Sequence, residues 1–172
     1  MTASDPRPQQ HPWYALKVRT KAEPFIGASL RNKSFETFLP TYTQSRAYSD
    51  RVKKVEVALF PGYLFCRLDI EKRLPILTTP GVEYIVSFDR IPQPVPEEEI
   101  EAIRRVLSAG GKAKPWPYLK VGDKVRVMTG PFTGVEGLLA SEKGNERLIL
   151  SITMLQRSVA VEIDRELIQP VH

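Results

Sequence analysis

The chain has 172 residues, of which 42% are hydrophobic and 26% are charged, with a formal net charge of +5. This apolar content is enough for one or two ordinary globular cores and argues against a disordered chain. The charge is uneven, because residues 1–60 carry ten Lys and Arg against five acids, whereas residues 61–172 carry fifteen of each. A basic first third indicates a polyanionic partner such as a nucleic-acid backbone, with a merely solvated surface as the alternative.

The composition also excludes several classes of protein. A single cysteine, Cys66, allows no disulfide and no four-cysteine zinc site, and the two histidines, His11 and His172, lie near the ends of the chain. There is no glycine-rich phosphate loop, no apolar run of the roughly 18 residues that span a bilayer, and no signal-peptide core. We therefore expect a cytoplasmic monomer without catalytic residues, cofactor or metal, and a disordered tail over residues 1–12.

The first hundred residues mix strand and helix signals. Thr20 and Glu23 match a capping box, which predicts a short amphipathic helix over the following residues. The charged loop that ends at Lys54 is expected to be the tip of a long hairpin. Alternating or aromatic runs predict strands at residues 13–19, 35–42, 55–57, 63–68 and 82–88.

A second helix is indicated after Pro96, because Ile100, Ile103 and Leu107 fall on one face. The three acids at residues 97–99 are interpreted as charges that complement the positive end of this helix. Residues 108–118 have no periodicity and combine Gly with Pro, so we expect a linker there.

The last third of the chain has the pattern of a small β-barrel. Five short runs with period-two alternation are separated by turn signals, and Gly137 inside one run indicates a bulge or a close backbone approach. A closed barrel would also protect the edge strands. The predicted strands lie near residues 125–127, 135–139, 148–152, 159–163 and 167–168.

An aromatic stretch at residues 58–65 stands out in a polar neighbourhood. Pro61 and Gly62 bend it, so Phe60, Tyr63 and Phe65 need not all face one core. Two interpretations are open: the rings belong to the core, or they present a hydrophobic binding patch.

This stretch, with residues 13–15, 121–127 and 130–134, resembles the NusG family of transcription elongation factors over about residues 13–171. The amino-acid sequence of residues 59–65 and the basic loop resemble those of the specialised antiterminators of the RfaH and capsule-operon kind. The resemblance implies an α+β chain: an NGN domain at 13–107, an antiparallel sheet flanked by helices, followed after the linker by an SH3-like KOW barrel at 119–172. One specialised paralogue holds its second domain as a helical hairpin, and a switch of that kind is the alternative here.

The family's partners imply three sets of site residues. The NGN domain is expected to bind the clamp helices of the RNA polymerase largest subunit through Phe60, Tyr63, Phe65, Ile85 and Phe88. The non-template DNA strand is expected to meet Arg46, Tyr48, Arg51, Lys53 and Lys54, with a basic loop that serves only solubility as the alternative. Ribosomal protein NusE or the termination factor Rho is expected to bind Met154, Leu155 and Arg157, unless the first two only close the barrel.

The resemblance therefore implies a transcription elongation and antitermination factor that reduces pausing or termination. The alternative is a ribosome- or RNA-associated KOW protein that does not act on polymerase. An RNA binder of that kind should carry an excess of basic residues on the barrel, whereas residues 119–172 are nearly balanced in charge.

Overall fold

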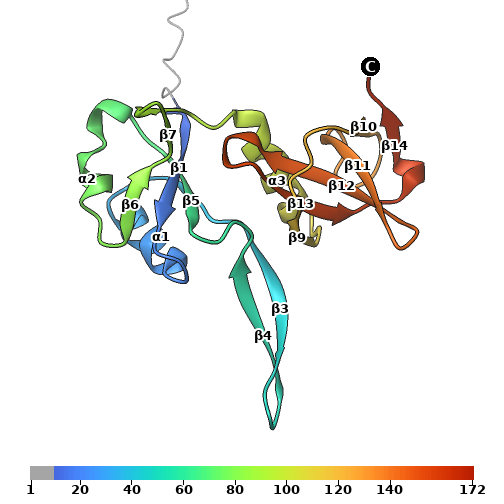
Figure 1. Ribbon diagram of the computed structural model, residues 1–172, viewed down its shortest axis with the longest axis horizontal. Helices are drawn as coiled ribbons and strands as arrows, with labels where there is room; N and C mark the ends of the chain where they lie inside the picture. Colours follow the sequence, from blue (N-terminus) through green and yellow to red (C-terminus); the bar gives the residue numbers. More distant parts are fainter. Residues whose placement is uncertain (1–9) are drawn as a thin grey trace, which may run out of the picture.

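The computed structural model describes residues 10–172, so residues 1–9 of the expected tail lie outside the described residues. The chain forms two units that lie side by side, with one long helix between them and a hairpin that projects away from both (Figure 1). We call them the first unit, built on a four-stranded sheet, and the second unit, built on a six-stranded sheet. The arrangement confirms the predicted α+β class.

The first unit is built on an antiparallel sheet in which each central strand buries residues on both faces. Trp13 and Ala15 point to one face of the sheet, and Leu16 and Val18 point to the other. In strand order the sheet contains β2 (Thr37–Phe38), β5 (Tyr63–Arg67), β1 (Trp13–Val18) and β6 (Val82–Ile85).

Helices cover both faces of this sheet. Ile26 and Leu30 of one helix and Ile76 of another pack on the face that carries Leu16, whereas Ile100 and Ile103 cover the opposite face. The helical segments are α1 (Glu23–Asn32), the 3-10 turn η1 (Ile70–Lys72), α2 (Leu74–Leu77) and α3 (Glu97–Ser108). Thr20 does not cap α1 as expected, because the helix begins at Glu23 with Ala22 before it.

Two hairpins extend the first unit. The longer one joins β3 (Thr41–Ala47) to β4 (Val52–Ala58) in a two-stranded sheet of its own, which confirms the predicted hairpin. The shorter one joins β7 (Ser87–Phe88) to β8 (Ile91–Pro92).

The second unit is a curled antiparallel sheet of six strands. Its strands, in sheet order, are β14 (Ile168–Pro170), β10 (Asp123–Val127), β11 (Glu136–Glu142), β12 (Asn145–Ile152), β13 (Arg157–Glu162) and β9 (Ala113–Trp116). Strands β10 to β13 pair in chain order, with β14 and β9 added at the two ends of the sheet. Two 3-10 turns, η2 (Thr153–Leu155) and η3 (Arg165–Leu167), follow β12 and β13. Gly137 marks a place where the backbones of β11 and β12 approach each other closely, because a Cβ there would lie 2.5 Å from the Ile149 carbonyl oxygen. Strand β9 lies inside the segment expected to be a linker, and it pairs with β13.

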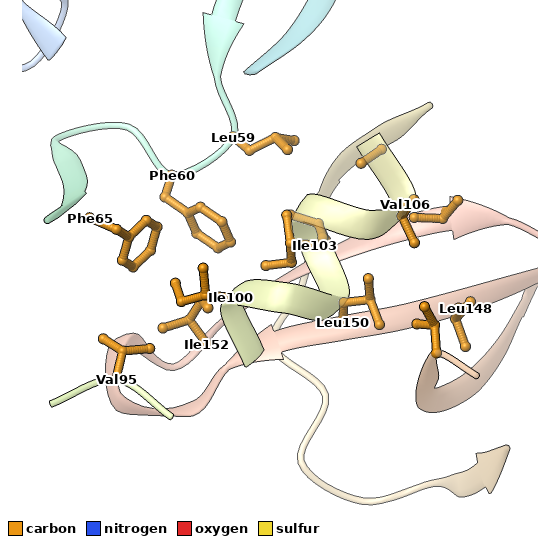
Figure 2. Packing of buried hydrophobic residues seen from close by; sticks show 14 of the residues in the cluster. Leu59, Phe60, Phe65, Val95, Ile100, Ile103, Val106, Leu148, Leu150 and Ile152 are labelled. Carbon is orange, nitrogen blue, oxygen red and sulfur yellow. The ribbon is translucent and has the colours of Figure 1, made fainter. Parts of the chain in front are cut away.

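Helix α3 joins the two units into one apolar cluster. Figure 2 shows Phe60 and Phe65 beside Ile103 and Ile100, while Leu148 and Leu150 of the second unit lie near Val106. Loop 130–134 adds a contact, since a Cβ on Gly111 would lie 2.8 Å from the Phe132 ring. The units are therefore docked along the whole length of α3.

Candidate functional site

The turn between β4 and β5 is fixed by contacts that the sequence does not reveal. The buried Glu23 carboxylate accepts a hydrogen bond from the Gly62 backbone N–H at 3.1 Å. Gly62 has a φ of +82°, a left-handed backbone conformation that favours glycine. This turn sets the direction in which Phe60 and Tyr63 leave the backbone.

Phe60 and Phe65 lie in the core of the protein. Their side chains are 1% and 0% exposed, and their ring centroids are 5.7 Å apart in an edge-to-face arrangement. Ile100 and Ile103 of α3 cover them (Figure 2). In this conformation these two rings therefore belong to the core and do not form a hydrophobic binding patch.

The other three residues expected to bind polymerase are separated from one another. Ile85 is buried on the opposite face of the sheet, against α1 and α2. Phe88 is 73% exposed at the end of β7, where its strand partner is Ile91, itself 62% exposed. Tyr63 is half-buried at the edge of the shared cluster. The five residues do not form one surface.

Tyr63 lies where the two units meet. Lys17 Nζ of the first unit is 5.7 Å from the Tyr63 ring centroid, and Arg157 Cζ of the second unit is 5.8 Å from it. Lys17 is also the strand partner of Tyr84 on β6, so Tyr63, Lys17 and Tyr84 form a row across the sheet. Tyr84 is half exposed.

The residues expected to bind NusE or Rho lie at the same place. Met154 and Leu155 are half-buried against the shared cluster, and Met154 and Phe88 line one cleft of about 460 Å³ together with Pro94. Two of the residues expected to bind polymerase, Tyr63 and Phe88, therefore lie beside Arg157 and Met154 of the second unit. We call the boundary between the units, formed by Tyr63, Glu99, Thr153, Met154 and Arg157, the seam.

The acids at the start of α3 do more than complement the helix end. Glu99 accepts hydrogen bonds from the Thr153 N–H at 3.2 Å and from the Thr153 hydroxyl at 2.6 Å, which ties α3 to the second unit. Glu97 accepts from Arg67 at 3.0 Å, which ties α3 to β5. No pattern in the sequence indicates these partners, because they lie 54 and 30 residues away.

Arg67 is the central charge of the first unit. Its buried guanidinium stacks on Trp13 at 4.4 Å and also pairs with Glu36, whose Oε2 lies 3.1 Å from Arg67 Nε. The hydrogen bond that it donates to Glu97 raises the pKa of Arg67 above its already high value. The positive charge is therefore permanent and holds α3 against the sheet.

The residues expected to bind DNA all lie on the β3–β4 hairpin and are exposed (Figure 1). Arg46 and Lys53 are direct strand partners, so they share one face, whereas Lys54 pairs with Ser45 on the other face. Tyr48 and Arg51 close the turn through a hydrogen bond from the Tyr48 N–H to the Arg51 carbonyl at 2.7 Å. Within residues 10–172, none of these four cations forms an ion pair.

Within residues 10–172, the features that bear on covalent and metal chemistry are the state of Cys66 and the grouping of the His, Cys, Asp and Glu side chains. Burial raises the pKa of the Cys66 thiol to about 12, which keeps it protonated and unreactive. Across the described part of the chain, no three His, Cys, Asp or Glu side chains are grouped to hold a metal ion. No helix among residues 10–172 is long and apolar enough to cross a membrane.

Comparisons with known proteins all point to one family. The sequence model of the family described as transcription termination factor nusG matches residues 11–104. The transcription termination/antitermination protein NusG of Thermus thermophilus is 30% identical over 88% of this chain and 94% of its own length. That of Pseudomonas aeruginosa is 28% identical over 84% of each chain.

The fold comparison agrees. A solved structure of domain interaction in Thermotoga maritima NusG matches with a TM-score of 0.53 and 20% identity, over 94% of this chain and 97% of that one. The resemblance to the specialised antiterminators stays a prediction. The chain belongs to the NusG family of transcription termination and antitermination proteins.

Proposed function

We propose that this chain binds the clamp helices of RNA polymerase through its first unit, reduces pausing or termination, and offers its second unit to NusE or Rho. The observation that carries the proposal is the exposed apolar pair Phe88 and Ile91, which lies beside the seam and has no cover within residues 10–172. Exposed apolar side chains that neighbour each other and form a patch are typical of a docking surface.

The proposed polymerase surface differs from the set expected from the sequence. It consists of Phe88 and Ile91 on the β7–β8 hairpin, and of Tyr84 and the exposed edge of Tyr63, which flank Lys17 in one row across the sheet. Phe60 and Phe65 support it from beneath by fixing the turn before Tyr63. Burying two such rings on a partner contributes roughly 1.5 to 3 kcal/mol each before association costs.

The second unit's partner residues belong to the same proposal. Met154 lies beside Phe88 and Arg157 lies beside Tyr63, so a protein that binds them would compete with the contacts across the seam. Polymerase binding at Tyr63 would compete with the same contacts. Binding of either partner would then favour the open arrangement by its differential affinity.

The alternative, an RNA-associated protein that acts through the second unit, has less support. Glu136 pairs with Lys124 at 3.4 Å and also with Arg126, and Arg147 lies 3.4 Å from Glu142. Cations that are held by acids of the same sheet are less available to a phosphate backbone. This favours a protein partner for the second unit.

A pull-down of RNA polymerase by the full chain tests the proposal. The double variant Phe88→Ala, Ile91→Ala should lose most polymerase binding while keeping its far-UV circular dichroism. Phe25→Ala is the matched control, because Phe25 is 70% exposed on α1, a helix that covers the opposite face of the sheet. Normal binding by the double variant, or an equal loss in the control, would remove this surface from the proposal.

A further inference from the structure

We propose that the β3–β4 hairpin binds double-stranded DNA as a ribbon inserted into the major groove, with Arg46, Lys53 and Gln44 on the face toward the bases. The inference rests on the proposed transcriptional function for its setting. It specifies the form of DNA and the face of the hairpin, and both can be measured without polymerase.

The first step is the arrangement of charge on the ribbon. Arg46 lies directly opposite Lys53, and Gln44 and Val55 form the next pair of residues on the same face. The two strands contain one carboxylate, Glu56, and it lies on the other face, where Thr41 and Thr43 donate hydrogen bonds to it. One face of the ribbon therefore carries cations and an amide without any acid.

The second step is that the two cations on this face have no acidic partner. Like charges placed directly opposite each other destabilise a pair of strands, and a two-stranded hairpin is only marginally stable by itself. Arg46 and Lys53 have no acidic partner within the described residues. A bound polyanion would relieve their repulsion.

The third step is accessibility. Thr43, Ser45 and Lys54, from the face that carries Glu56, line a cleft of about 570 Å³ between the hairpin and the end of α3. Tyr42, at the base of the hairpin on the face of Arg46, also lines this cleft, but neither Arg46 nor Lys53 does. Figure 1 shows the hairpin extending well beyond both units, so a large ligand can reach its tip.

The fourth step distinguishes a duplex from a single strand. The major groove is about 12 Å wide and admits a two-stranded ribbon, and Arg, Lys and Gln are side chains that hydrogen-bond base edges there. Each strand has seven residues, which at about 3.4 Å per residue gives a ribbon of roughly 24 Å. Proteins that bind single strands present several aromatic rings for stacking. Tyr48 is the one aromatic residue on the outer half of this ribbon.

Fluorescence anisotropy of the full chain with a labelled 20-base-pair duplex, and separately with one of its strands, tests the inference. The duplex should bind at least about fivefold more tightly, and its affinity should fall steeply with salt. Lys53→Gln should weaken duplex binding at least about threefold, and Arg46→Gln with Lys53→Gln at least about tenfold.

Lys54→Gln is the matched control, because it removes the same charge at the neighbouring position on the opposite face. It should change duplex affinity less than about twofold. Equal effects of Lys53→Gln and Lys54→Gln, or a single strand that binds as tightly as the duplex, would overturn the inference. Polymerase pull-down by the same variants separates the two proposals: loss of duplex binding with polymerase binding retained supports this one, whereas loss of polymerase binding with duplex binding retained would overturn it.

Discussion

Arg157 of the second unit lies 5.8 Å from the centre of the Tyr63 ring of the first unit. The same ring is 5.7 Å from Lys17, so Tyr63 is held by a cation from each unit. Each such contact contributes about 0.5 to 2 kcal/mol, depending on how far it is removed from water. The docking of the units therefore depends in part on a residue that we also propose to meet polymerase.

Opening the seam should make the second unit more mobile and the polymerase surface more available. The double variant Glu99→Ala, Arg157→Ala removes the carboxylate that holds Thr153 and the cation that lies on Tyr63. We expect hydrogen exchange of the Thr153 amide to accelerate and polymerase affinity to rise by about threefold to thirtyfold, in line with the about 0.5 to 2 kcal/mol that interactions of these two kinds contribute. Arg165→Ala is the control, since Arg165 pairs with Glu146 within the second unit. Unchanged exchange in the double variant would show that Glu99 and Arg157 do not hold the units together.

Truncation of Phe60 and truncation of Phe88 should have very different effects on the free energy of unfolding. Phe60 is buried in the shared cluster, so Phe60→Ala should lower the free energy of unfolding by about 3 to 5 kcal/mol. Phe88 is largely exposed, so Phe88→Ala should change it by no more than about 0.5 kcal/mol. Urea denaturation followed by circular dichroism measures both. A Phe60→Ala protein of normal stability would contradict the core position of this ring.

The sequence predicts the long periodic elements of this protein well. The strands that become β1, β5, β12 and β13, and helix α3, all have apolar residues at the spacing of their buried faces. Strand β9 is not predictable in the same way, because Pro115 interrupts its pattern. Proline is tolerated there because β9 is an end strand of its sheet.

The candidate site is less predictable, because it depends on long-range contacts. Ile85 and Phe88 are close in sequence, yet the register between β1 and β6 shifts at Lys17 and Val18, and the chain leaves the sheet after Ile85. The pairing of Glu99 with Thr153 joins residues with no local signal of each other. In contrast, the sequence identifies the basic residues of the hairpin as one exposed group, and only their division between two faces needs the strand register.

Gly137 should be intolerant of any side chain. A Cβ at this position would lie 2.5 Å from the Ile149 carbonyl oxygen and 2.9 Å from the Leu148 side chain, and the backbone oxygen cannot move without distorting β12. We expect Gly137→Ala to lower the free energy of unfolding by at least about 2 kcal/mol, seen as a fall of several degrees in Tm. Gly122→Ala is the control, because its Cβ would make only ordinary contacts from 3.6 Å outward. Equal Tm values for the two variants would contradict the close approach.

Glu136 gives the second unit a measurable response to acid. The hydrogen bond from Arg126, at 2.8 Å from its Nε, and then that from Lys124 hold the pKa of the Glu136 carboxyl below its usual value. Since the folded state lowers this pKa, the ion pair stabilises the fold above the unfolded-state pKa, and that contribution is lost as the pH falls through the lowered value. Arg126→Gln should therefore raise the pKa of Glu136 toward the ordinary value and make stability less dependent on pH in the acid range. Titration of the carboxyl carbon by NMR measures this shift. Arg165→Gln should leave the pKa of Glu136 unchanged, because Arg165 pairs with Glu146 instead, and an unshifted Glu136 in Arg126→Gln would show that Lys124 alone sets it.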